Sequence, residues 1–193
     1  MSITTHERPG VYSSYGASSL IRGSGGRKTV GLVAVNTKAT AKTVYTITSY
    51  EEAVTTFGSA GGQDMAELIR VILLNGAAAV AAVPIAASTD YEAGFAVLEG
   101  QENVSVVVCD STTQTDQQDL RDSVAAASAA RRERIAVVGG AASETVTNLI
   151  SRAAALNSER VVLVAPGGTD EDGTALSGIT AAAAVAGAIA AQS

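Results

Sequence analysis

The sequence has few of the side chains that most often carry chemistry. Its 193 residues include one histidine (His6), one cysteine (Cys109) and no tryptophan. A single cysteine excludes an intramolecular disulfide framework and fits a reducing compartment. One histidine and one cysteine form no cluster that could hold zinc. A Ser–His or Cys–His catalytic pair would have to recruit His6 from the N-terminal region. We therefore expect no cofactor, no metal site and no enzymatic activity.

Charge and hydropathy argue against two classes of partner, nucleic acids and membranes. The chain has 13 Lys and Arg against 19 Asp and Glu, a net charge of −6, which argues against nucleic acid as the main partner. The longest near-apolar run, residues 178–190, is shorter than the roughly 20 residues of a membrane span. The start, MSITTHERPG, lacks the regions of a secretory signal. We expect neither a nucleic-acid partner nor insertion into a membrane.

Apolar runs alternate with helical patterns from residue 30 onward, and 47% apolar residues, mostly Ala and Val, are enough for one large core. This alternation predicts an α/β fold, a mostly parallel sheet flanked by helices. Strands are expected at residues 30–35, 44–48, 77–83 (ended by Pro84), 104–109, 135–138 and 161–165. Helices are expected at residues 50–57, 63–75, 90–98, 116–131, 143–156 and from about 176.

Capping residues mark several helix ends. Ser49 and Glu52 form a capping box at the start of the first helix. Gly58 and Gly76 are suited to the residue after a helix. Ser143 is the expected cap of the helix that runs to residue 156.

A glycine-rich stretch, RGSGGRKT at residues 22–29, superficially resembles a phosphate-binding loop. Arg27 stands where the Walker pattern requires glycine, and Lys28 occupies the third glycine position of G-x-G-x-x-G. The glycines also precede a strand, whereas phosphate loops follow one. The stretch therefore predicts a flexible hinge at Gly23, Gly25 and Gly26.

Two short segments at the expected ends of strands, residues 109–111 and 139–140, each allow a structural and a chemical interpretation. Cys109 is best interpreted as a small core residue, with Asp110 and Ser111 satisfying backbone groups at a turn. Gly139-Gly140 follows a strand and precedes a helix, where a tight connection is the ordinary explanation and anion binding the sharper one.

Two charged stretches also have two interpretations. Arg131, Arg132 and Arg134 either complement the dipole of the preceding helix or form a patch for an acidic neighbouring subunit. The carboxylates of residues 169–173 lack the spacing of a calcium loop, so a solvated surface loop is expected.

Four stretches carry a family resemblance. HERPGVYSSY, with the tetrad from Pro9 to Tyr12, resembles the N-terminal signature of contractile-tail sheath proteins. Residues 46–58 are similar to the sheath pattern of a strand, a serine-led helix and a final Phe-Gly. Residues 77–84 (AAAVAAVP) and the alanine-rich residues 180–190 follow in the order seen in sheaths. The likeness is to sheaths of myophages and of phage-tail-like bacteriocins of Gram-positive bacteria.

The resemblance implies a structural subunit of a contractile tail sheath, or an N-terminal fragment of one. Such a sheath polymerises around an inner tube and contracts to drive it through a target cell envelope. It implies other sheath subunits in a helical array, the inner tail tube protein and the baseplate as partners. The implied location is a virion tail sheath or a phage-tail-like particle, assembled in the bacterial host cytoplasm.

The resemblance also divides the chain into an extended N-terminal arm with its hinge, residues 1–28, and a core domain, residues 29–193. Such arms pair as strands with neighbouring subunits. The expected interface residues are Pro9, Gly10, Val11, Tyr12 and Tyr15, and the hinge residues are Gly23, Gly25 and Gly26. Sheath proteins continue past the alanine-rich helix into a further domain, so we expect this chain alone to be a monomer or a weak oligomer.

Two other interpretations stay open from the sequence. The chain could be a flavodoxin-like α/β domain that binds a small phosphorylated ligand at the strand ends. It could also be a protein-interaction domain outside any injection machine.

Overall fold

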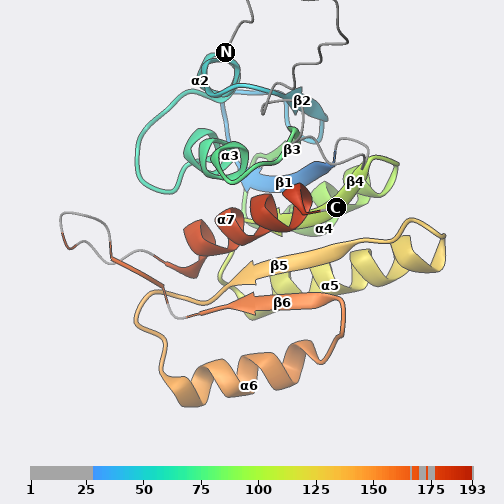
Figure 1. Cartoon of the computed structure of the whole chain (residues 1–193), viewed down its shortest axis with the longest axis vertical. Coiled ribbons are helices and arrows are strands. Elements are labelled where there is room, and N and C mark those ends of the chain that lie inside the picture. The colour runs from blue at the N-terminus through green and yellow to red at the C-terminus, as the bar shows by residue number, and fades with distance from the viewer. Residues whose placement is uncertain (1–27, 166, 170–172, 174–176, 193) are drawn as a thin grey trace, which may run out of the picture.

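A six-stranded sheet forms the centre of the computed structural model, which describes residues 28–165, 167–169, 173 and 177–192 (Figure 1). The strand order is β2-β3-β1-β4-β5-β6. All neighbours pair in parallel except β2, which runs antiparallel to β3 at one edge. The predicted mostly parallel sheet is confirmed. The strands are β1 (Thr29–Val35), β2 (Tyr45–Ile47), β3 (Ala79–Ile85), β4 (Val104–Cys109), β5 (Ile135–Gly139) and β6 (Val161–Val164).

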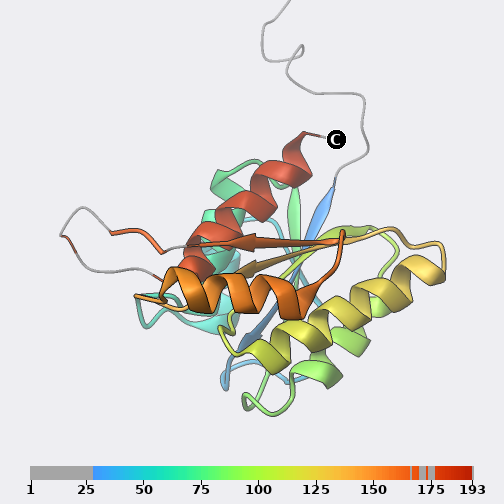
Figure 2. The same ribbon diagram turned by 90° about the horizontal axis from the view of Figure 1, so that it is seen from below.

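Helices cover both faces of the sheet (Figures 1 and 2). One face packs against α2 (Tyr50–Phe57), α3 (Met65–Leu74) and α7 (Gly178–Ala191). The other packs against α4 (Tyr91–Glu99) and α5 (Gln114–Ala129), with α6 (Val146–Leu156) beside α5. This arrangement explains the continuous apolar runs, because a strand covered on both faces buries every side chain.

The core therefore has two halves, one on each side of the sheet. Leu32 of β1 and Ile69 of α3 are fully buried in the first half, and Val33 and Phe95 belong to the second. Small residues bring α7 close to α3. A Cβ atom added at Gly187 would lie 2.4 Å from the carbonyl oxygen of Ile72.

Helix ends follow the predicted capping chemistry at both ends of α2 and at the C-terminal end of α3. The Ser49 side chain accepts a hydrogen bond from the Glu52 N–H, and Gly58 ends α2 with a φ of 77°. Asp64 caps α3 by accepting from the Glu67 N–H. Gly76, with a φ of 106°, turns the chain after α3 as predicted.

The predicted boundaries of α5 and α6 are wrong. Thr145 rather than Ser143 caps α6, since its side chain accepts from the Asn148 N–H, whereas Ser143 has a left-handed φ of 60°. The helix predicted at residues 116–131 spans Gln114–Ala129. It therefore ends before Arg131, which has a φ of 64°.

Pro84 lies inside β3 rather than ending it as predicted. Its carbonyl oxygen accepts from the Lys42 N–H, on the side of β3 away from β1. The proline nitrogen points to the same side, because the N–H and C=O of one strand residue share a direction. The ring therefore removes no hydrogen bond from the β1–β3 ladder, and β2 pairs only with residues 80–82.

Candidate functional site

The described chain begins and ends at the same end of the sheet (Figure 2). The Lys28 carbonyl accepts from the Ala78 N–H at 3.4 Å. A Cβ atom added at Gly76 would lie 2.7 Å from the Cβ of Ala191. The start of β1 and the last turn of α7 thus flank the turn between α3 and β3. Lys28, the first described residue, therefore lies at this end of the sheet, near the end of α7.

The residues predicted to form the subunit interface and the hinge belong to residues 1–27, which lie outside the described residues. Their roles stay predictions. They are Pro9, Gly10, Val11, Tyr12 and Tyr15 for the interface and Gly23, Gly25 and Gly26 for the hinge.

The opposite end of the sheet, at the carboxyl ends of its parallel strands, is where an α/β protein would bind a ligand. The five parallel strands lie in the order β3-β1-β4-β5-β6. Numbered along the chain among themselves, they have the order 2-1-3-4-5. Doubly wound sheets with this order bind ligands at the carboxyl ends of the two strands where the order reverses. These two strands are β1 and β4, which end at Val35 and Cys109.

Asp110 fills this position with internal contacts. Its carboxylate accepts from the Val35 N–H at 3.0 Å and from the hydroxyl of Tyr91. Its own N–H donates to the Val33 carbonyl at 3.3 Å. Burial raises the pKa of Asp110, against the lowering effect of these hydrogen bonds. Burial and the neighbouring Asp110 also raise the pKa of Tyr91.

Cys109 and Ser111 on either side of this carboxylate are structural. The Cys109 side chain is fully buried, and burial raises its pKa to about 12, so the thiolate needed for nucleophilic chemistry is disfavoured. The Ser111 hydroxyl donates to Asp116 and accepts from the Thr113 N–H at 3.0 Å. The predicted core role of Cys109 and turn role of Ser111 are confirmed, and Asp110 satisfies backbone on β1 as well.

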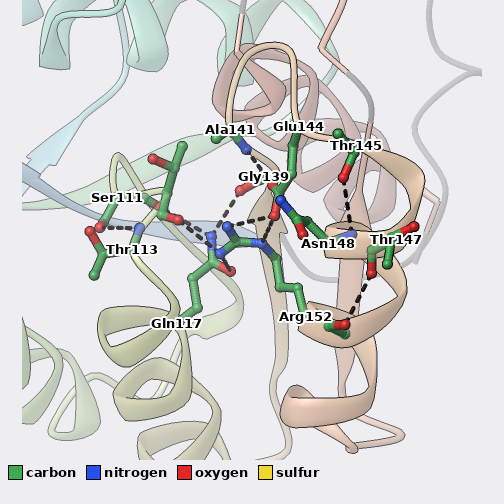
Figure 3. A network of polar contacts seen from close by, with 12 residues as sticks. Ser111, Thr113, Gln117, Gly139, Ala141, Glu144, Thr145, Thr147, Asn148 and Arg152 are labelled. Carbon is green, nitrogen blue, oxygen red and sulfur yellow. Dashed lines mark hydrogen bonds and ion pairs between the residues drawn. The ribbon is translucent and has the colours of Figure 1, made fainter.

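A buried glutamine continues this polar edge between β4 and β5 (Figure 3). Gln117 of α5 is fully buried. Its amide nitrogen donates to the carbonyls of Gly139 at 2.8 Å and of Ser111 at 3.1 Å. The side chain therefore donates to two backbone carbonyls near the ends of β4 and β5.

Arg152 connects this glutamine to α6 (Figure 3). It donates to the Gln117 side-chain oxygen at 3.1 Å and to the Thr112 carbonyl at 2.8 Å. It also forms an ion pair with Glu144 at 2.9 Å in which both side chains are almost completely buried. Burial opposes ionisation of Glu144, but the hydrogen bonds from Arg152 and from the Ala141 N–H give its carboxyl a lowered pKa. These hydrogen bonds link α5 and α6 to the ends of β4 and β5.

The Gly139-Gly140 turn is a tight connection, as predicted. The Gly140 N–H donates to the Val164 carbonyl at 3.0 Å, and the Gly178 N–H donates to the Gly140 carbonyl at 2.9 Å. A Cβ atom at Gly139 would lie 2.3 Å from the carbonyl carbon of Gly178. The start of α7 therefore packs directly against Gly139, and the Gly140 N–H is used within the chain.

Two arginines of the cluster bind the end of α4 rather than the end of the preceding helix, α5. Arg132 donates to the Glu99 carbonyl. Arg134, 2% exposed, donates to the carbonyls of Leu98 at 2.8 Å and of Gln101. The two side chains thus satisfy the C-terminal carbonyls of α4, a favourable place for cations, and do not complement α5.

Two further classes of site are absent from the part of the chain that the structure describes. It contains no group of three or more His, Cys, Asp or Glu side chains placed to hold a metal ion. Within the same residues, none of the helices has the length and hydropathy of a membrane span.

Comparison with solved structures finds this fold in sheath proteins. The sheath tail protein of Desulfitobacterium hafniense matches with a TM-score of 0.67 at 13% identity, over 94% of this chain and 62% of that one. The sheath tail protein of Listeria innocua matches with a TM-score of 0.65 at 14% identity, over 91% and 59%. The contracted helical sheath of the anti-feeding prophage matches with a TM-score of 0.59 at 17% identity, over 95% and 52%.

No protein-family model matches the chain, and no curated protein sequence matches it. The chain spans between about half and three fifths of the length of the sheath proteins that it matches. At these identities the likeness shows the fold. The α/β fold predicted from the sequence is therefore confirmed as one found in contractile sheath proteins, and the flavodoxin-like alternative is not supported.

Proposed function

We propose that this chain is the N-terminal portion of a subunit of a contractile tail sheath. The observation that carries the proposal is the match of at least 91% of the chain to sheath proteins from two bacteria and from the anti-feeding prophage. The sheath-like motifs at residues 9–12 and 46–58 support it independently.

The chemistry of the described residues agrees with a structural role. The carboxyl edge of the sheet is filled by Asp110, Gln117 and Arg152, whose polar atoms bond to other parts of the chain. The single cysteine is buried. The proposal is therefore a non-enzymatic one, in which rigid domains are linked and move as bodies.

In this proposal the chain assembles with other sheath subunits into a helical array around an inner tail tube protein, above a baseplate. Baseplates of the anti-feeding prophage are among the matched structures. The particle is a virion tail or a phage-tail-like particle, assembled in the host cytoplasm. The arm of residues 1–28 pairs as a strand with a neighbouring subunit, through Pro9, Gly10, Val11, Tyr12 and Tyr15.

The test is to express the complete reading frame that contains this chain, with and without the tube protein encoded beside it. Negative-stain electron microscopy is expected to show hollow tubes of stacked rings. The chain of 193 residues expressed alone serves as the control and is expected to remain a monomer or a weak oligomer. Only small particles from the complete reading frame, in the presence of the tube protein, would count against the proposal.

A further inference from the structure

The sheet ends at β6, whose outer edge pairs with no other strand among the described residues. On its inner side, the Ala136 N–H donates to the Arg160 carbonyl at 2.8 Å, and the Gly140 N–H donates to the Val164 carbonyl at 3.0 Å. Backbone groups alternate in direction along a strand, so the N–H and C=O of Leu163 point away from β5. The open edge therefore offers a donor and an acceptor to a further strand.

This edge lacks the residues that usually protect an open strand. Its sequence, VVLV, contains neither a charged side chain nor a proline. The Val162 side chain is 37% exposed on the face that α7 covers. The Leu163 side chain packs on the opposite face, with the core beneath α4 and α5. An apolar edge of this kind is suited to pairing with another chain.

An apolar flank of α6 lies beside this edge. The helices α4, α5 and α6 follow one another toward β6 on their face of the sheet, so α6 is the outermost (Figures 1 and 2). The Arg152 side chain and the Ala155 carbonyl bond to α5. Val146, Ile150 and Ala153 lie on the opposite flank, since α-helical residues three and four apart share a face. The first two of them are 72% and 65% exposed.

We call β6 and this flank of α6 the edge patch, and the patch carries no exposed charge. Arg152 is the only charged residue of α6, and β6 has none. The Arg152 side chain is almost completely buried in its ion pair with Glu144. The whole chain has a net charge of −6, which would oppose contact between copies through a charged surface. An uncharged patch can meet its own copy without bringing like charges together, as a two-fold interface requires.

The geometry of the edge patch suits a two-fold contact. If β6 pairs antiparallel with β6 of a second copy, Leu163 can lie opposite its own counterpart and exchange both backbone hydrogen bonds with it. The two-fold axis is then perpendicular to the sheet, so both α6 helices lie on the same side of the joined sheet. Their flanks that point away from α5 face each other, and each apolar stripe covers the other.

We infer that the edge patch is a two-fold interface between copies of this chain, formed by antiparallel β6–β6 pairing and by contact between the two α6 helices. Each copy contributes only a four-residue strand and one helix flank, less than the roughly 1,000 Å² of a stable interface. The dimer is therefore weak, with a Kd on the order of 10⁻⁴ M. This interface is independent of the proposed sheath function, because it rests only on the surface of the described residues.

Sedimentation equilibrium of the purified chain, from about 10 µM to about 1 mM, tests the association. A monomer is expected at the lowest concentration and mostly dimer at the highest. Ile150→Glu should weaken the Kd by about tenfold or more, because it adds like charges to both facing flanks. Leu74→Glu is the matched control and should leave the Kd unchanged, since Leu74 is 71% exposed but belongs to α3, on the other face of the sheet.

Hydrogen exchange of backbone amides tests the strand contact over the same concentrations. The Leu163 N–H is expected to exchange more slowly as the concentration rises, because it gains an acceptor in the dimer. The Val162 N–H points toward β5, so its exchange should not depend on concentration and serves as the internal control.

Four results would overturn the inference. They are a monomer at all concentrations, a dimer that Ile150→Glu and Leu74→Glu weaken equally, a dimer in which exchange at Leu163 does not slow, and association that continues beyond the dimer, which indicates an open-ended contact. The same measurements on a variant without residues 1–27 identify another occupant. If the dimer forms only in this variant, residues 1–27 cover the edge patch in the full chain, and the inference is wrong.

Discussion

At the residue scale, Asp110 lies where a doubly wound sheet would offer room for a ligand. Its carboxylate instead accepts from the Val35 N–H and the Tyr91 hydroxyl. Burial raises the pKa of this aspartate. The native state therefore binds a proton at Asp110 more tightly than the unfolded chain does. As the pH rises and this proton is lost, the free energy of unfolding falls.

Asp110→Asn should make this cost visible. A raised native pKa favours the native state below the unfolded value, about 3.9, and the advantage is lost as the pH rises through the native value. The asparagine can keep both contacts if the Tyr91 hydroxyl reverses its role and accepts. The variant is therefore expected to gain stability relative to wild type between pH 3.5 and 7, measured by urea unfolding. If the stability of the variant relative to wild type stays constant over this range, or grows toward low pH, the pKa of Asp110 is not raised in the native state.

Cys109 gives a second residue-scale prediction. Its side chain is fully buried and its pKa is raised to about 12. Ellman's reagent at pH 8 is expected to detect no thiol in the native protein and one thiol per chain in guanidinium chloride, since Cys109 is the single cysteine. Rapid reaction of the native protein would mean that this edge of the sheet opens to solvent.

At the element scale, glycine contacts hold α7 against the sheet. A Cβ atom at Gly139 would lie 2.3 Å from backbone of Gly178. Gly139→Ala must therefore displace the start of α7, and we expect a loss of about 3 kcal/mol or more in the free energy of unfolding. Gly100→Ala is the control, since its nearest atom is 3.8 Å away, and it should change stability by less than about 1 kcal/mol. Equal effects in thermal or urea unfolding would contradict this packing.

Local chemistry made the elements predictable from the sequence. The Ser49–Glu52 cap, Gly58 and Gly76 act within one turn of their own helices, so their effects can be predicted without the tertiary structure. The prediction for Ser143 was wrong because Thr145, two residues later, offers the same hydroxyl to α6. The sequence alone cannot choose between two such caps.

Long-range contacts were not predictable in the same way. A glutamine in a polar helix such as Gln117 would be expected at the surface. It is buried instead, and its amide nitrogen donates to the carbonyls of Gly139 and Ser111. The sequence offers two roles for Arg134, at the end of α5 or on a subunit interface, whereas its side chain binds a carbonyl of α4, more than 30 residues earlier. Such pairings depend on which elements the sheet order brings together.

At the scale of the whole molecule, the proposed arm and the described residues lead to separate predictions. Residues 28–192 contain a two-sided core, and the predicted interface residues lie before it. Deletion of residues 1–20 is therefore expected to leave the thermal unfolding of this chain nearly unchanged, while it blocks tube formation by the complete protein. A loss of several kcal/mol, as large as a core cavity causes, would show that the arm packs on its own domain.

The central claim is that this chain belongs to the shaft of a contractile particle. Antibodies raised against the purified chain of 193 residues, used for immunogold electron microscopy of particles released by the bacterium that carries the gene, test this claim most directly. Gold is expected in regular rows along the sheath of extended particles and on the shortened sheath of contracted ones. Gold confined to other structures, with bare tail shafts in the same field, would contradict it.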